Sequence, residues 1–273
     1  MVSEQAAKPP IIELENVGKW FNPPRGDRLV AIENINLSIP DEEDGEFVVL
    51  LGPSGCGKST ILSMLSGMYA ADTGEVRLFG KPVKYPEPSA VTVPQSYTCF
   101  PWLTVLGNVE FGLDVMGVPA AKRRKIAAEY LERVGLSDRL NASPRQLSGG
   151  MQQRVAIART LAMRPPVVLM DEPFGALDAQ TRTEMQEMLT ALWAREKNLI
   201  LFITHDITEA LLLADRIVVL SPRPARIIHD MRVPLARPRL PAMVYDPKFV
   251  ALSQALLDLL KKSPTSGQVR VTL

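Results

Sequence analysis

Cysteine, long apolar runs and net charge are all scarce in this 273-residue sequence, and each shortage excludes a class of protein. Its only cysteines, Cys56 and Cys99, are too few for a disulfide framework or a four-thiolate zinc site, which favours a reducing, cytosolic setting. No apolar run approaches the ~20 residues of a membrane span, because Asp215 and Arg216 interrupt the most apolar stretch, Leu211 to Leu220. If this protein works at a membrane, we expect another subunit to span it.

The charges are balanced, with 31 basic and 30 acidic residues and a net charge of +1. This balance gives no overall attraction to nucleic acid or to an anionic membrane surface, so we expect no nucleic-acid partner. Residues 1–10 lack the apolar segment of a secretory signal. With 46% hydrophobic residues, the chain can bury a sizeable core as one large domain or as one domain with an appended lobe.

A glycine-rich motif stands between two apolar segments. Gly52 is followed by four residues and then by Gly57-Lys58-Ser59, the spacing of a phosphate-binding loop. The preceding segment Phe47–Leu51 is typical of a buried strand, and an apolar helical pattern follows the motif. Glycines let backbone N–H groups converge on an anion at the N-terminus of that helix. Lys58 would then reach the β- and γ-phosphates of a nucleotide, and the Ser59 hydroxyl would bind Mg²⁺.

The alternative for this motif is a strand-to-helix turn that binds nothing, and the flanking strand and helix patterns favour the nucleotide. Cys56 lies inside the loop, where its backbone amide matters more than its sulfur. We expect bulky thiol reagents to inhibit nucleotide binding through Cys56.

Two further motifs lie downstream. Residues 147–154, Leu-Ser-Gly-Gly-Met-Gln-Gln-Arg, open an expected helix and again offer a helix N-terminus to an anion. An apolar strand-like segment then ends in Asp171 and Glu172. Neighbours on a strand point to opposite faces, so these two carboxylates can do different jobs. Asp171 is suited to holding Mg²⁺, and Glu172 to polarising an attacking water.

Two polar residues mark the ends of later elements. Asp178 is expected to cap a helix over residues 179–195. His205 follows a strand-like segment, Leu199–Ile203. A histidine at such a place is more often structural, but its position after this strand favours a functional role.

The order of elements predicts one domain over residues 1–273 with a helical insertion. Residues 10–94 and 144–233 are expected to form a nucleotide-binding core, and about 95–143 an inserted helical subdomain. Residues 234–273 are expected to form a linker, a helix and a loose tail.

Apolar periodicity places the elements within these parts. The proline-rich segment 81–94 is expected to be mostly extended and irregular. The cluster Phe100-Pro-Trp102 is either an exposed docking site or buried packing, and both remain open. Other strands are expected over 11–17, 29–39, 74–80, 216–220 and 226–233, and other helices over 104–116, 119–134 and 249–261.

With both glycine motifs and the paired carboxylates in this order, the chain resembles an ATP-binding cassette (ABC) ATPase subunit over nearly its full length. The resemblance implies an α/β fold: a P-loop NTPase core with an antiparallel β subdomain and an inserted helical subdomain. It also implies hydrolysis of ATP with Mg²⁺. The residues implied to bind the nucleotide are Phe21 (or Trp20) against adenine, Gly52, Pro53, Ser54, Gly55, Cys56, Gly57, Lys58, Ser59 and Thr60 of the loop, Ser148, Gly149, Gly150 and Gln152 of the signature, and Asp178.

The same resemblance implies catalytic roles. Glu172 would orient or deprotonate water, His205 would contact the γ-phosphate beside Lys58, and Gln95 would sense Mg²⁺ and water. The implied metal ligands are Ser59, Gln95 and Asp171. In such proteins two ATPs lie in a head-to-tail dimer, each between the phosphate loop of one subunit and the signature of the other. This chain has one copy of each motif, so a second ATPase subunit, identical or homologous, is implied.

Within that family, three segments are similar to subunits of importers for nitrate, sulfonate, taurine or bicarbonate: 100–109, 203–227 and 245–249. This similarity implies transmembrane permease subunits that contact residues near 95–104, and indirectly an extracytoplasmic solute-binding protein. It implies a peripheral location on the cytoplasmic face of the inner membrane. The alternatives are an exporter's ATPase subunit, a soluble ABC ATPase acting on DNA or ribosomes, and a nucleotide-binding regulator without turnover.

Overall fold

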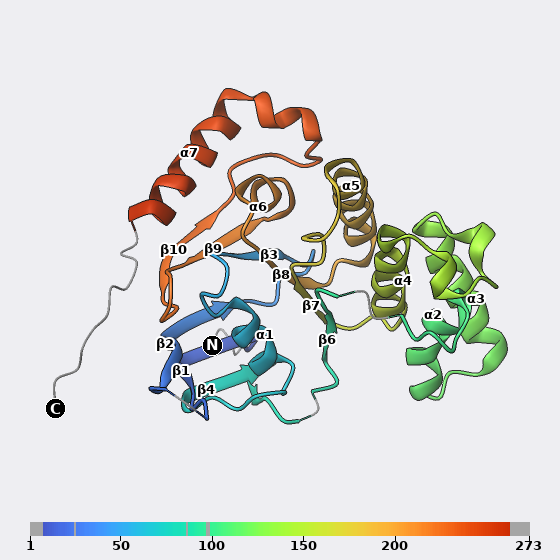
Figure 1. Ribbon diagram of the computed structural model, residues 1–273, viewed down its shortest axis with the longest axis horizontal. Helices are drawn as coiled ribbons and strands as arrows, with labels where there is room; N and C mark the ends of the chain where they lie inside the picture. Colours follow the sequence, from blue (N-terminus) through green and yellow to red (C-terminus); the bar gives the residue numbers. More distant parts are fainter. Residues whose placement is uncertain (1–7, 25, 86, 97–98, 263–273) are drawn as a thin grey trace, which may run out of the picture.

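The computed structural model describes residues 8–24, 26–85, 87–96 and 99–262 (Figure 1). The expected loose tail, 263–273, lies outside the described residues. In the described part of the chain the strands form two sheets, and helices cover them. The larger sheet and its helices carry most of the residues singled out above.

The main sheet has six strands within the described residues, in the order β10-β9-β3-β8-β7-β6. All neighbours pair parallel except β10, which is antiparallel to β9. The central strands are buried on both faces, which explains their nearly continuous apolar sequences. The strands are β3 (Phe47–Leu51), β6 (Ala90–Val93), β7 (Val167–Asp171), β8 (Leu199–Thr204), β9 (Arg216–Leu220) and β10 (Ile227–Arg232).

Parallel pairing brings the carboxyl ends of three strands to one edge of this sheet. Leu51 at the end of β3 pairs with Thr204 at the end of β8, and Asp171 at the end of β7 pairs with Ile203. The residues that follow these ends, at 52, 172 and 205, therefore meet at the same edge.

A second, antiparallel sheet has the order β2-β1-β4-β5 within the described residues. With helix α1 it encloses a separate apolar cluster against one face of the main sheet. The first strand is longer than the expected 11–17. The elements are β1 (Ile12–Phe21), β2 (Leu29–Ile39), β4 (Thr73–Leu78), β5 (Lys81–Pro82) and α1 (Lys58–Leu65).

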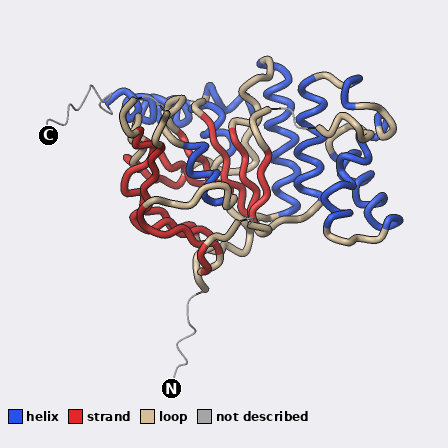
Figure 2. Tube along the Cα trace, turned by 60° about the horizontal axis from the view of Figure 1, so that its bottom comes forward, coloured by secondary structure: helices blue, strands red, loops and turns tan. Residues whose placement is uncertain are grey.

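Helices α2, α3 and α4 stand together at one end of the molecule, beyond α5 and away from the antiparallel sheet (Figures 1 and 2). Tyr130, Leu131 and Ala127, which share one face of α3, are buried in the same apolar cluster that covers the main sheet. The remaining helices are α2 (Val105–Val115), α3 (Ala120–Arg133), α4 (Gly149–Ala162), α5 (Ala179–Glu196), α6 (Ile207–Leu213) and α7 (Pro247–Lys262), with short 3₁₀ turns at Ser137–Arg139, Pro144–Gln146 and Pro241–Tyr245.

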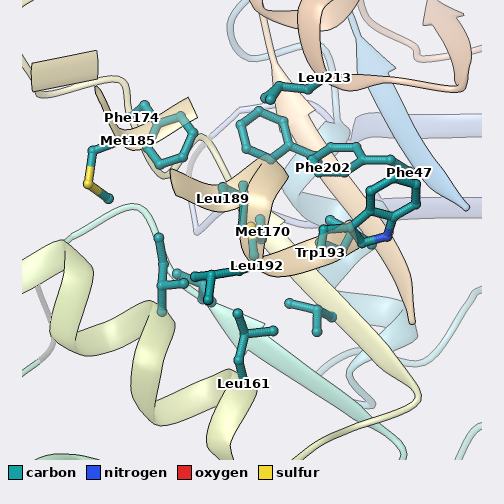
Figure 3. Packing of buried hydrophobic residues seen from close by; sticks show 14 of the residues in the cluster. Phe47, Leu161, Met170, Phe174, Met185, Leu189, Leu192, Trp193, Phe202 and Leu213 are labelled. Atoms are coloured by element: carbon teal, nitrogen blue, oxygen red, sulfur yellow. The ribbon is translucent and has the colours of Figure 1, made fainter. Parts of the chain in front are cut away.

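Aromatic packing attaches α5 to the main sheet (Figure 3). The Trp193 ring on α5 meets the Phe47 ring edge-on with centroids 5.8 Å apart, and Phe202 lies 5.8 Å from Phe47. Met185, Leu189 and Leu192 of the same helix are buried. These residues form the apolar stripe by which α5 packs on the sheet.

The irregular conformation expected for residues 81–94 is wrong at its two ends. Lys81–Pro82 pairs with β4, and Ala90–Val93 forms an edge strand parallel to β7. Prolines dominate the local pattern, but residues 90–93 are Ala-Val-Thr-Val. Residues 90–93 form a strand because the buried neighbour β7 supplies hydrogen-bond partners for them. The local sequence pattern does not indicate this pairing.

Two arginines fix the segment that was expected to be a linker. Arg237 donates from Nε to Asp215 Oδ1 at 2.8 Å and from Nη2 to Leu213 O at 2.6 Å. Arg239 is buried and donates to the carbonyls of Leu211, Ala214 and Leu235. Burial, with the charge of Arg237 nearby, lowers the pKa of Arg239 to about 10.

Among the described helices, none is long and apolar enough to cross a membrane.

Candidate functional site

The glycine loop lies between the end of β3 and the start of α1. Gly57 has φ of 129°, and a Cβ on it would lie 2.9 Å from the Ala31 carbonyl oxygen. Both the positive φ and the close approach require glycine at this position. The loop therefore folds tightly, and α1 begins at Lys58 with its N-terminus directed to the loop.

Lys58 is buried and bends back over this loop. Its Nζ donates to Gly52 O at 2.9 Å and to Pro53 O at 3.0 Å. The same Nζ lies 3.3 Å from Glu172 Oε1. The ammonium thus joins the phosphate-binding loop to the carboxylate after β7.

Ser59 and Asp171 are in direct contact. The Ser59 hydroxyl donates to Asp171 Oδ1 at 2.9 Å. Burial raises the pKa of Asp171, and the hydrogen bond from Ser59 offsets part of this effect. The two residues expected to hold a metal through oxygen atoms therefore present those atoms side by side.

Glu172 faces a different set of partners from Asp171. Its Oε2 lies 3.1 Å from His205 Nδ1, while Oε1 faces Lys58. Its backbone has φ of 42°, in the left-handed region, and its N–H donates to Ile203 O. A non-glycine residue held there is strained, and such strain is concentrated at functional sites.

A cavity of about 310 Å³ opens over these groups. It is lined by eight of the expected site residues and by one that was not expected, Arg223. Glu172 borders a second, smaller cavity of about 40 Å³ on the side of His205. The larger cavity is lined by Ser54, Gly55, Gly57, Lys58, Ser59, Thr60, Gln95, Glu172 and Arg223.

Other expected site residues lie elsewhere in the subunit. The Phe21 ring packs edge-on against Tyr69, with centroids 5.6 Å apart, and is not among the described residues lining the cavity. Ser148 caps α4 by accepting from Met151 N, and Gln152 Nε2 donates to Leu147 O. Gly149 and Gly150 form the first turn of that helix.

Asp178 is the N-cap of α5, as the sequence predicted, and its Oδ1 accepts from Thr181 N at 3.0 Å. Together with residues 148–152, it is absent from the described lining of the nucleotide-loop cavity. The chain therefore brings the phosphate loop, Asp171, Glu172 and His205 together, and leaves the signature residues outside that cluster.

The expectation of thiol inhibition through Cys56 does not agree with its environment. Cys56 is 2% exposed, and burial raises the pKa of its thiol. The reactive species is the thiolate, which is disfavoured in such surroundings. We therefore expect Cys56 to resist thiol reagents in the folded protein.

Two polar residues of this region were not anticipated. Arg223 Nη2 donates to Gly55 O at 2.7 Å. Glu209, 5% exposed, borders the small cavity and accepts from Gln186 Nε2 at 3.1 Å, and burial raises its pKa. The only available signal for Arg223 was its place after β9, whose carboxyl end lies beside that of β3.

A family model described as "ABC transporter" matches residues 32–175, more than half of the chain. This chain belongs to the ABC transporter family. It is an ATP-binding, ATP-hydrolysing cassette, and the predicted fold class and enzyme class are confirmed.

Named relatives and a solved structure agree with this family assignment. A nitrate import ATP-binding protein of Synechococcus elongatus is 43% identical over 253 residues, which cover 91% of each chain. A bicarbonate transport ATP-binding protein of Synechocystis is 44% identical, covering 91% of this chain and 88% of that one. A dimeric ATP-binding cassette in a post-hydrolysis state with ADP and phosphate has a TM-score of 0.68 and 31% identity, covering 82% of this chain and 100% of that one.

Proposed function

We propose that this ABC cassette is the ATPase subunit of a membrane importer for a small anion or organic solute such as nitrate, bicarbonate, sulfonate or taurine. The observation that carries the proposal is the 43–44% identity to nitrate import and bicarbonate transport subunits over 91% of this chain. Solute contacts lie in other polypeptides of such importers, so the cassette would supply the ATP-driven step.

Three side chains would act directly on ATP. Glu172 would accept a hydrogen bond from the water that attacks the γ-phosphate and would orient it. Lys58 would move from Glu172 and the loop carbonyls to the phosphates, and His205 would contact the γ-phosphate from the far side of Glu172. Glu172 lies 3.3 Å from Lys58 and 3.1 Å from His205, which supports the proposal that the three side chains act together.

The donor set beside the loop fits Mg²⁺. Ser59 and Asp171 offer a hydroxyl and a carboxylate oxygen in contact, and Gln95 lines the same cavity. Mg²⁺ prefers such oxygen ligands, with phosphates and water completing its shell. When bound, it would neutralise charge on the phosphates. Ser59, Asp171 and Gln95 are the residues that would hold it.

We further propose that two cassettes share each ATP. The chain carries one phosphate loop and one signature, and the signature residues lie outside its own cavity. Ser148, Gly149, Gly150, Gln152 and Asp178 would then serve the site of a second subunit, as the dimeric state of the solved relative supports.

The surface around Trp102 is the proposed permease contact. Trp102 is 74% exposed, so buried packing does not explain it, and its ring stacks on Phe100 with centroids 5.4 Å apart. Phe111, 43% exposed, lies 4.7 Å from Phe100. An exposed aromatic cluster suits a protein partner. Docking there would hold the cassette on the cytoplasmic face of the inner membrane, with a solute-binding protein engaging the opposite side of the permease.

The importer proposal is tested by uptake in cells that lack this chain. Labelled nitrate, bicarbonate, sulfonate and taurine are supplied separately, and the wild-type chain or its Glu172→Gln variant is restored. We expect uptake of one of these solutes to return with the wild-type chain alone. Unchanged uptake of all of them in the deletion strain would contradict the proposal while leaving the ATPase assignment intact.

The shared site is tested with two inactive variants, Lys58→Ala and Ser148→Arg. In a mixed dimer the two lesions meet in one site and leave the other site intact. We expect each variant alone to be inactive and the mixture to regain part of the ATPase activity. A mixture as inactive as its components would contradict a site shared between copies of this chain.

A further inference from the structure

Arg223 lies in the turn between β9 and β10 and reaches the phosphate loop. Its Nη2 donates to Gly55 O at 2.7 Å, across 168 residues of sequence. It also lines the cavity that contains Lys58, Ser59 and Glu172. The family match, which covers residues 32–175, does not extend to this turn.

The charges of the cavity make this position important. Among the described residues that line it, Lys58 and Arg223 are the basic ones, and Glu172 is acidic. The Lys58 ammonium already contacts Glu172 and two loop carbonyls. An ATP phosphate chain carries several negative charges. A second cation at the cavity wall would therefore substantially lower the electrostatic cost of placing those charges in the cavity.

The turn that carries Arg223 is held firmly by the antiparallel sheet. Ala225 N donates to Ala31 O at 2.9 Å, and Glu33 N donates to Ala225 O at 3.0 Å. Within the turn, Ser221 Oγ donates to Pro224 O and accepts from Arg226 N, both at 3.0 Å. Arg223 therefore projects from a fixed platform, and little ordering is needed for it to meet a ligand.

We propose that Arg223 is a phosphate-binding residue of the ATP site, acting from the β9–β10 turn. A guanidinium has five N–H donors in a planar fork, so it can hold the Gly55 carbonyl and a phosphate oxygen together. This contact deepens the ATPase assignment, on which it rests, and does not depend on the transported solute. The ligand class is the polyphosphate of a nucleoside di- or triphosphate.

A purely structural role would be the support of Gly55 by a hydrogen bond. Two substitutions separate the roles. Arg223→Gln keeps an N–H₂ donor for the Gly55 carbonyl and removes the charge, whereas Arg223→Lys keeps the charge and loses the fork. Phosphate binding requires the charge, and support of the loop requires only the donor.

The experiment measures the affinity of the full-length chain for ATP and ADP by titration with a fluorescent nucleotide, and KM and kcat for ATP. We expect Arg223→Gln and Arg223→Ala to weaken ATP binding roughly 10-fold, the usual worth of a hydrogen bond to a charged group. Arg223→Lys should retain part of the affinity. KM should rise more than kcat falls, because the contact is made in the ground state as well.

Arg226→Ala is the matched control. Arg226 lies three residues away in the same turn but donates to Glu33 Oε2 at 2.8 Å and is not among the described residues lining the cavity. Its loss should leave ATP affinity unchanged. Melting curves identify which variants are folded.

ATP affinity of folded Arg223→Gln equal to that of the wild type would overturn the proposal and leave Arg223 as a support for the loop. An equal loss of affinity in Arg226→Ala would also overturn it, because the turn as a whole would then be responsible. Failure of the wild-type chain to bind ATP would instead contradict the ATPase assignment.

Discussion

The Lys58 ammonium lies 3.3 Å from Glu172 Oε1, so the residue that would bind phosphate is engaged by the proposed catalytic carboxylate. Only 3% of the Lys58 side chain and 16% of the Glu172 side chain is exposed. An ion pair this sheltered competes with the nucleotide for the same ammonium. Catalysis and binding are therefore linked at one nitrogen atom.

This competition gives the first prediction. Glu172→Gln should abolish steady-state hydrolysis, preserve ATP binding and favour a trapped dimer. It should also tighten ATP binding several-fold, since the competing attraction of the Glu172 carboxylate for the Lys58 ammonium is removed. Phosphate release and nucleotide titration measure the two effects. Glu187→Gln, on the exposed face of α5, is the control; hydrolysis at the wild-type rate in Glu172→Gln would remove Glu172 from the catalytic role.

The aromatic surface gives the second prediction. Trp102→Ala should reduce co-purification of the permease more than it reduces basal ATPase activity, because the ring is 74% exposed and lies outside the described lining of the ATP cavity. Tyr245→Ala, which removes another exposed aromatic side chain near the C-terminal helix, should leave assembly unchanged. If Trp102→Ala recovers as much permease as Tyr245→Ala, Trp102 does not contact the permease.

Glu46 gives a prediction about pH. Burial raises its pKa above the ordinary 4.5, further raised by Glu42 and Asp215 and partly opposed by Arg232 and Arg216. Neither carboxylate oxygen has a hydrogen-bond partner among the described residues. The folded protein thus holds this proton to higher pH than the unfolded chain does. The stability from Glu46 is complete below the unfolded pKa and is lost as pH rises through the folded pKa.

Glu46→Gln should therefore flatten this dependence. The melting temperature of the variant relative to the wild type should increase between pH 4.5 and pH 8, by about 2–4 °C for each kcal/mol of relieved burial cost. Glu43→Gln changes an exposed carboxylate of the same turn and serves as control. A melting-temperature difference between Glu46→Gln and the wild type that stays constant over this pH range would contradict the raised pKa of Glu46.

The fourth prediction concerns Cys56. Its thiol is buried, and burial raises its pKa. A bulky thiol reagent should therefore leave ATP hydrolysis intact during an incubation that labels unfolded protein fully. Labelled Cys56 is located by peptide mass spectrometry before and after denaturation. Rapid labelling of Cys56 in folded protein, with loss of ATP binding, would restore the original expectation.

Local patterns predicted the parts of the fold that depend on local causes. The strand over residues 47–51, the loop and the helix after it follow from apolar runs and glycine spacing, and the Asp178 cap follows from residue type. Ser59 and Asp171 were each expected to hold Mg²⁺, and the 2.9 Å hydrogen bond between them brings their oxygen atoms together.

The remainder depends on contacts between distant segments. Ala90–Val93 becomes a strand because β7 lies beside it, and no spacing within the proline-rich segment signals that neighbour. Arg223 binds a backbone carbonyl, which any residue type can offer, so no pair of side chains marked it in the sequence. Glu172 likewise combines a positive φ with a hydrogen bond from its N–H to Ile203 O on the neighbouring strand β8, a contact that no local pattern signals.

Gly150 of the signature is buried against α5, and a Cβ placed on it would lie 2.7 Å from Thr181 Cγ2. The glycine is thus needed for contact between α4 and the first turn of α5 within one subunit, besides its proposed contact with a partner's nucleotide. An inactive variant at position 150 consequently has two possible origins, misfit inside the monomer and a defective interface. Lesions at this glycine should therefore be interpreted alongside Thr181→Ser, which removes the Cγ2 methyl group that a Cβ at position 150 would meet.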